Sequence, residues 1–314
     1  MSTAGGKRSA ASRAAAMPRL RRPPRLADDA HKGDAGRVLC VAGSETMPGA
    51  AVLVARSAGR AGAGLVCIGC LDDAPFRALP ALCPEAVLVD LRRAFDARGR
   101  PSSAAAAGFA AREPHARLVG PGIGDDARAR AVIALALGGG LASPLAIDAD
   151  GLNALDGEPE RLAAAPGPVV VTPHPGEAAR LLGHAVPSGE AGRAECAVEL
   201  ARRGRCIAVL KGAGTVVTDG ERVLVNRTGN AGMATGGAGD VLAGILVAYL
   251  ALTGRGRGEW TPFDAAAAAV HVHGLAGDLA AARLGRRAVM ASDLVALLPD
   301  AQRAVDGEAA GAGA

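Results

Sequence analysis

Aromatic side chains are scarce in this sequence of 314 residues, which contains one tryptophan, one tyrosine and four phenylalanines. The aromatic platforms on which nucleic-acid bases stack are therefore not available. A large excess of positive charge is missing as well, because the formal net charge is only +4 and no basic stripe with interleaved aromatic residues occurs. Both features argue against a nucleic-acid partner.

Long apolar runs and paired metal-binding cysteines are also lacking. The longest apolar stretch, residues 241–252, is shorter than the ~20 residues of a membrane-spanning helix, so we expect no membrane segment. Most of the six cysteines lie in apolar runs, where cysteine behaves as a small hydrophobic residue. Cys67 and Cys70 have C-x-x-C spacing, but no second such pair and no histidine pair lies nearby. We therefore expect reduced thiols and no metal site built from protein ligands alone.

The first 26 residues contain Lys7, six arginines and no acidic residue. They lack the apolar core of a secretory signal, and Arg21-Arg22 is not followed by the apolar run of a twin-arginine signal. An organellar transit peptide shares this composition, but arginine replaces lysine along the whole chain, so we favour a disordered tail over residues 1–26. We expect one domain over residues 27–306, a flexible tail over 307–314 and a cytoplasmic location.

Short apolar segments alternate with helical patterns along most of the chain. Strands that are apolar throughout are covered on both faces, which is typical of a mostly parallel sheet between two layers of helices. A β-hairpin on the turn Asp219-Gly220 and a helical C-terminus complete the predicted α/β fold. The expected strands are 37–42, 65–68, 86–89, 117–119, 144–147, 169–171, 207–210, 215–218 and 222–225. The expected helices are 48–63, 125–137, 177–182, 190–203, 240–252, 262–284 and 292–305.

Polar or glycine-rich clusters follow several of these strands, at residues 43–44, 120–124, 148–153, 172–177 and 211–215. Open α/β sheets bind ligands beyond the carboxyl ends of their strands, so we expect these clusters to line a cleft. Loops are often polar and rich in glycine without a function, but five clusters in one topological position favour a ligand site.

The most informative segment runs from Asn226 to Asp240, contains five glycines and precedes a strongly apolar helix. Free amides at a glycine-rich helix start form an anion site. A carboxylate beside a bound phosphate can serve as general base for an attacking hydroxyl, which makes Asp240 the candidate catalytic residue. The alternative is that Asp240 only caps the helix, although a cap does not require the glycines. The segment matches neither the P-loop nor the Rossmann pattern.

Two further segments supply candidate ligand contacts. Residues 211–215 (KGAGT) join a strand to the hairpin, and their glycines allow close approach to a flat ligand such as adenine or ribose. The chain has only three lysines, which weakens the alternative that Lys211 is an ordinary surface residue. His174 lies between two prolines at a strand end, where a ligand contact and a structural role are both open. His271 and His273 are two apart on a helix, so they face different directions and form no metal pair.

Several segments of the chain occur together in a fixed order. They are residues 31–34 (HKGD), 36–38 (GRV), 43–44 (GS), 48–51 (PGAA), 120–124 (GPGIG), 148–153 (DADGLN), 172–177 (TPHPGE), 211–215 (KGAGT) and 230–240 (NAGMATGGAGD). This set resembles the ADP/ATP-dependent NAD(P)H-hydrate dehydratases of the ribokinase-like superfamily, over about residues 29–300.

The resemblance implies a ribokinase-like fold and repair of damaged nicotinamide cofactors. The S epimer of hydrated NADH or NADPH would be phosphorylated on its ring hydroxyl by ADP or ATP, with Mg²⁺, and phosphate would then be eliminated. Asp240 would be the base and a substrate contact. The hydrated cofactor would also contact Ala50, Gly122 and His174. The nucleotide would bind Lys211, Gly212, Ala213, Gly214, Thr215 and Gly239.

Other expectations concern partners and alternative functions. Some members of the family carry an epimerase domain, and only about 30 residues precede the first motif here, too few for a domain, so we expect a separate epimerase protein. We also expect a homo-oligomer. Arg227 stands where the motif would have proline. The alternatives are a small-molecule kinase of the same fold, acting on a sugar or a vitamin-precursor alcohol, and a non-enzymatic nucleotide sensor, against which the intact Asp240 argues.

Overall fold

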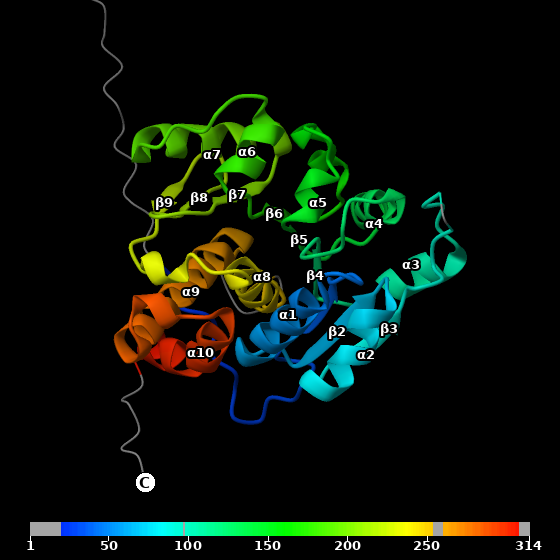
Figure 1. Ribbon diagram of the computed structural model, residues 1–314, viewed down its shortest axis with the longest axis horizontal. Coiled ribbons are helices and arrows are strands. Elements are labelled where there is room, and N and C mark those ends of the chain that lie inside the picture. The colour runs from blue at the N-terminus through cyan, green and yellow to red at the C-terminus, as the bar shows by residue number, and fades with distance from the viewer. Residues whose placement is uncertain (1–19, 97, 254–259, 308–314) are drawn as a thin grey trace, which may run out of the picture.

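A nine-stranded sheet forms the centre of the molecule, with strand order β3-β2-β1-β4-β5-β6-β7-β8-β9 (Figure 1). The computed structural model describes residues 20–96, 98–253 and 260–307. Strands β1 to β7 are parallel to one another, whereas β8 is antiparallel to β7 and to β9. The strands are β1 (Arg37–Val41), β2 (Leu65–Cys70), β3 (Val87–Asp90), β4 (Ala116–Val119), β5 (Leu145–Ile147), β6 (Val169–Val171), β7 (Ile207–Leu210), β8 (Val216–Thr218) and β9 (Val223–Val225).

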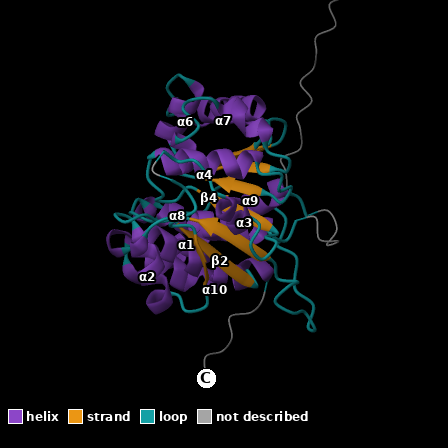
Figure 2. Cartoon of the chain, turned by 90° about the vertical axis from the view of Figure 1, so that its right-hand side faces the viewer, coloured by secondary structure: helices purple, strands orange, loops and turns teal. Residues whose placement is uncertain are grey.

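Helices cover both faces of the sheet (Figures 1 and 2). One face packs against α1 (Pro48–Arg60), α2 (Asp73–Leu82), α8 (Ala238–Leu250), α9 (Pro262–Leu284) and α10 (Ala291–Asp306). The other packs against α3 (Ser103–Phe109), α4 (Ala127–Gly138), α5 (Asp150–Asn153), α6 (Pro175–Leu182) and α7 (Glu190–Gly204). Short 3-10 segments are η1 (Pro159–Ala164), η2 (Ala231–Met233) and η3 (Arg286–Ala288).

Each central strand is buried on both sides, as the continuous apolar runs predict. Val38 and Cys40 of β1 belong to the core under α1 and α8, whereas Leu39 and Val41 belong to the opposite core. Helix α8 is buried along most of its length, so the longest apolar run of the chain is a core helix. Within the described residues, none of the helices combines the length and apolar character needed to cross a membrane.

The structure differs from the sequence-based expectations at several helices. Helices α2 and α3 were not predicted: α2 contains Pro75 and Pro80, which interrupt the helical pattern, and α3 is mostly alanine without apolar periodicity. Helix α8 begins at Ala238, two residues earlier than expected. The hairpin is confirmed, with Gly220 of its turn at φ +92°.

Residues 1–19 and 308–314 lie outside the described residues, so the expected tails and domain limits stay predictions. Residues 20–26 lie beside the end of α10, where Arg22 and Arg25 donate to the carbonyl oxygen of Asp306 at 3.2 and 2.8 Å. All six cysteines are buried free thiols. Burial raises the pKa of the Cys70 thiol to about 12, and its neighbour Cys67 is raised too, which keeps both protonated.

Candidate active site

The loops that follow neighbouring strands meet at the carboxyl edge of the sheet. The amide of Gly43, after β1, donates to the carbonyl of Pro121, after β4, at 2.8 Å. Gly120 has φ +131°, and a Cβ there would lie 1.9 Å from the carbonyl oxygen of Asp148, after β5. Only glycine allows this approach. The structure therefore brings the predicted clusters after β1, β4 and β5 together.

The loop between β9 and α8 is fixed to helix α9. The amide of Gly229 donates to Asp278 Oδ2 at 2.8 Å, and Asn230 Nδ2 donates to Asp278 Oδ1 at 2.9 Å. Thr228 Oγ1 donates to the carbonyl of His271 at 2.9 Å. These bonds give the rare Asn230 a structural role and hold the glycine-rich segment against a buried helix.

The start of α8 presents free backbone donors. The N-cap is Gly237, whose φ of +86° suits glycine, and no side chain caps the helix. Among the described residues, no acceptor takes the amide protons of Gly236, Gly237, Gly239 or Asp240. Unpaired amides at a helix start carry partial positive charge, so this turn is suited to a phosphate.

Asp240 is the third residue of α8 and does not act as its cap. Its carboxylate accepts no hydrogen bond from any residue that the structure describes. Burial, with the negative charge of Asp148 next in importance, raises the pKa of Asp240 to about 6, while Lys211 opposes the rise. A carboxylate with a pKa near neutrality is a stronger base than an exposed aspartate and is still ionised at pH 7.

Lys211 joins the loops after β5, β6 and β7. Its Nζ lies 2.6 Å from Asp148 Oδ1 and 3.9 Å from Glu177 Oε2. Burial alone would lower the pKa of Lys211, but the carboxylates of Asp148 and Glu177 outweigh burial and raise it. A Cβ on Gly239 would lie 3.6 Å from Lys211 Nζ, which places the ammonium beside the free amides of α8.

A cavity of about 820 Å³ opens between the loop after β7 and the glycine-rich loop. Its walls include the predicted nucleotide-binding residues Lys211, Gly212, Ala213, Gly214, Thr215 and Gly239. Arg227 and His273 also line it. Sequence reasoning considered His273 only as a metal ligand; the structure buries its ring at the cavity, and burial lowers its pKa to about 4, so it is neutral.

The predicted substrate contacts lie apart from this cavity. Gly122 has φ +64°, and a Cβ there would be 2.8 Å from the Cβ of Ala50, so these two predicted residues are adjacent. His174 follows β6, and its Nδ1 accepts the amides of Gly176 and Glu177 at 3.0 and 3.3 Å. His174 therefore caps α6, and half of its side chain remains exposed.

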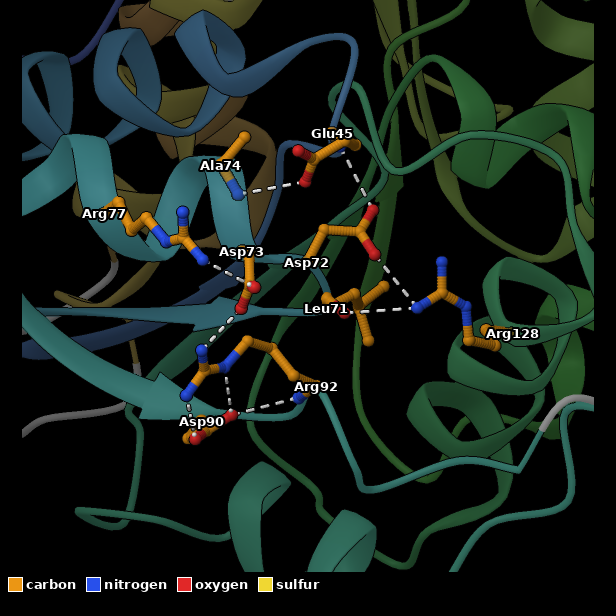
Figure 3. A network of polar contacts seen from close by, with 9 residues as sticks. All are labelled: Glu45, Leu71, Asp72, Asp73, Ala74, Arg77, Asp90, Arg92 and Arg128. Carbon is orange, nitrogen blue, oxygen red and sulfur yellow. Dashed lines mark hydrogen bonds and ion pairs between the residues drawn. The ribbon is translucent and has the colours of Figure 1, made fainter.

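A second polar cluster lies beyond β2 and β3, at the far end of the same edge (Figure 3). Arg92 pairs with Asp90 at 2.7 Å and with Asp73 at 2.5 Å, and Arg128 pairs with Asp72 at 3.0 Å. Since these arginines are matched by carboxylates, the cluster ties α2, β3 and α4 together.

The fold and the site define the class of protein. A mostly parallel sheet with a late hairpin, and a glycine-rich helix start that carries a half-buried aspartate, are those of ribokinase-like enzymes. A solved ribokinase-like superfamily protein from Enterococcus faecalis is similar over 90% of this chain and 92% of that chain, with 26% identity and a TM-score of 0.73. A family model described as NAD(P)H-hydrate dehydratase matches residues 38–300, so the chain belongs to that family.

Individual relatives agree with this assignment. A bifunctional NAD(P)H-hydrate repair enzyme from Moorella thermoacetica is 40% identical over 91% of this chain, which spans about half (52%) of that protein's length. An ADP-dependent (S)-NAD(P)H-hydrate dehydratase from Neisseria meningitidis is 36% identical over 81% of this chain and 80% of its own. An ADP/ATP-dependent NAD(P)H-hydrate dehydratase from Bacillus subtilis, co-crystallised with ATP and Mg²⁺, covers 90% of this chain and 94% of its own, with 29% identity and a TM-score of 0.73.

Proposed function

We propose that this protein dehydrates the S epimer of hydrated NADH or NADPH back to the reduced cofactor, at the expense of ADP or ATP. The observation that carries the proposal is the unpaired carboxylate of Asp240, with its pKa raised to about 6, in the same helical turn as four free amides. A base next to an anion site is what phosphoryl transfer to a hydroxyl requires. Membership of the dehydratase family supports the assignment of that hydroxyl to the nicotinamide ring.

The proposed reaction has two stages. Asp240 accepts the proton of the ring hydroxyl while the hydroxyl oxygen attacks the terminal phosphorus, and the nucleotide leaves one phosphate shorter. The C–O bond then breaks with loss of phosphate, and a proton leaves the neighbouring ring carbon, which restores the double bond. The free amides of Gly236, Gly237, Gly239 and Asp240 and the Lys211 ammonium would bind the phosphates, and residues 212–215 the adenosine end.

The described residues contain no group of three or more His, Cys, Asp or Glu side chains that could enclose a metal ion. Mg²⁺ at phosphoryl-transfer sites is usually held by one or two carboxylates together with substrate phosphates. Asp148 and Asp150, which follow β5 at the carboxyl edge of the sheet, would supply these carboxylates. The ion would supply charge neutralisation on the phosphates.

Ala50, Gly122 and His174 are the proposed contacts of the hydrated cofactor. Ala50 lies in the first turn of α1, which follows β1, and Gly122 and His174 lie in the loops after β4 and β6. Strand order places β5, with Asp148 at its end, between β4 and β6. The ring would therefore lie over the carboxyl end of β5, with the nucleotide on the β7 side. Comparing KM for the hydrated cofactor with KM for the nucleotide in single variants separates the two subsites.

The test is incubation of the purified chain with hydrated NADH and either ADP or ATP. Recovery of the near-ultraviolet absorbance of reduced nicotinamide, in step with release of phosphate, is the expected result. No recovery with either nucleotide, alongside phosphorylation of another alcohol, would identify a small-molecule kinase of the same fold instead. The same titration decides between ADP and ATP, and between the two hydrated cofactors.

Two partner assignments complete the proposal. The epimerase activity that supplies the S epimer is proposed to lie outside residues 38–300, since the site above serves one reaction. A homo-oligomer in the cytoplasm is the proposed state of the chain, and its buried free thiols suit a reducing compartment. Sedimentation of the purified protein tests the oligomeric state, and fractionation of cells tests the cytoplasmic location.

A further inference from the structure

We propose that Arg193, on the first turns of α7, is the positioning residue of the nucleotide site. Its guanidinium donates from Nη1 to the carbonyl of Ala213, and from Nη2 to the carbonyls of Leu210 and Lys211 at 3.2 and 3.1 Å. The residue is only 8% exposed. Three backbone carbonyls, at the end of β7 and in the loop that follows it, therefore accept hydrogen bonds from one buried cation. The inference rests on the proposed function, because it assigns this loop to the nucleotide.

The loop cannot satisfy these carbonyls by itself. Lys211 and Ala213 lie beyond the end of β7, where the sheet no longer supplies hydrogen-bond partners, and a buried carbonyl without a donor is costly. Hydrogen bonds from a charged donor are stronger than those between neutral groups. Arg193 thus fixes the path of the chain between Leu210 and Ala213, which forms one wall of the cavity of about 820 Å³.

Gly212 leaves the space that the Arg193 guanidinium occupies. It has φ +140°, and a Cβ there would lie 2.8 Å from Arg193 Nη2. The sequence predicted that the glycines of this loop permit close approach of a ligand; at Gly212 the space is taken by the guanidinium instead. The loop conformation and the arginine are therefore matched to each other.

Helix α7 also contacts the opposite wall of the cavity. Glu190, one turn before Arg193, forms a two-pronged ion pair with Arg227, at 2.7 and 2.9 Å. Arg227 lines the same cavity. Because the Glu190–Arg227 pair is exposed and ion pairs in water contribute little, the buried bonds of Arg193 are expected to dominate.

Arg193 would affect nucleotide binding indirectly, by holding in place the loop that carries Lys211. Moving this segment would separate Lys211 Nζ from Asp148, 2.6 Å away, and from the start of α8. Loss of the guanidinium should therefore weaken nucleotide binding while leaving the loops after β1 and β4, proposed to hold the other substrate, in place. We expect Kd and KM for the nucleotide to rise about tenfold or more, and KM for the hydrated cofactor to change by less than about twofold.

The experiment compares Arg193→Lys and Arg193→Met with the same changes at Arg117. Arg117 is a matched control, since it is 1% exposed and its guanidinium donates to the backbone carbonyls of Ala136, Leu141 and Ser143, away from the cavity. Each protein is measured for Tm, for nucleotide Kd by calorimetric titration, and for KM of both substrates. Tm should fall in both sets of variants, but nucleotide affinity should fall only in the Arg193 set. Arg193→Lys should retain more of that affinity than Arg193→Met.

A folded Arg193→Lys or Arg193→Met protein with unchanged nucleotide Kd would overturn the proposal, as would an equal loss of affinity in the Arg117 set. If neither Arg193 variant folds, Gly212→Ala gives the answer, because its methyl group would displace the guanidinium while leaving the charge present. Unchanged nucleotide Kd in Gly212→Ala would then refute the role of Arg193. Failure of the proposed function is distinct: the wild-type chain would not restore hydrated NADH with ADP or ATP, whatever its nucleotide Kd.

Discussion

Replacing Asp240 by asparagine should abolish turnover and make the protein more stable. Burial, with the charge of Asp148, raises the pKa of this carboxyl from 3.8 to about 6. One pKa unit corresponds to about 1.4 kcal/mol, so the ionised carboxylate lowers the free energy of unfolding by about 3 kcal/mol at neutral pH. Asparagine is similar in shape and carries no charge, so most of this cost disappears. The amides that would bind phosphate are untouched, so nucleotide binding should persist.

The pH dependence of this gain has a defined sign. The folded-state pKa of Asp240 is higher than the unfolded-state pKa, so the wild type is relatively more stable when the carboxyl is protonated and loses that advantage as pH rises. The stability difference between Asp240→Asn and wild type should be absent below about pH 4, should grow between about pH 4 and 6, and should be constant above about pH 6.

Denaturant unfolding at pH 4 and pH 8, together with the absorbance assay and nucleotide titration, checks these expectations. Asp126→Asn is the control, because Asp126 caps α4 through the amide of Ala129, its pKa is lowered, and asparagine caps equally well. That variant should gain no stability at either pH. Turnover retained in Asp240→Asn would refute its role as base, and a loss of stability at pH 8 would refute the burial argument.

Three further outcomes are expected. Lys211→Met leaves the buried Asp148 carboxylate without its partner, so the free energy of unfolding, measured in urea, should fall by about 3 kcal/mol. Because Lys211 also lowers the pKa of Asp240, the acid limb of the kcat/KM profile should move to higher pH in this variant. Gly122→Ala places a methyl group 2.8 Å from Ala50 in backbone at φ +64°, so KM for the hydrated cofactor should rise while KM for the nucleotide does not. In the wild type, kcat/KM should fall below about pH 6, where protonated Asp240 can no longer accept a proton, and a flat profile would contradict this.

Much of the architecture follows from patterns that the sequence displays directly. The strands from β1 to β7 are mostly apolar because helices cover both faces, with Arg37, Asp90 and Arg117 as the charged exceptions. The turn Asp219-Gly220 marks the hairpin. Helix α2 was missed because Pro75 and Pro80 interrupt its pattern, although its apolar residue Leu79 is fully buried. Both prolines lie within three residues of an end of this ten-residue helix, where they are tolerated. Whether a helix forms around them depends on tertiary packing.

The candidate site shows a different limit. Asp240, Lys211 and the glycines could be found because their types are rare or clustered. Arg193 could not, since it is one of many arginines and its sequence neighbours carry no glycine motif. Its role arises from a contact across about 20 residues of chain, with Ala213. The pairing of Lys211 with Asp148 has the same origin, because only the sheet order places β5 and β7 on either side of β6.

The third position of α8 resolves a conflict in this site. A carboxylate beside a phosphate would repel it, and a capping carboxylate would also occupy the amides that are proposed to bind the phosphate. Asp240 avoids the second problem, because from the third residue it leaves the amides of Gly237 and Gly239 without an acceptor. The first problem is eased by those amides and by the nearby Lys211 ammonium, whose attraction for anions is strengthened by the same burial that raises the pKa of Asp240. Burial therefore makes the proposed base more basic and would strengthen the proposed anion site at once, at the expense of stability.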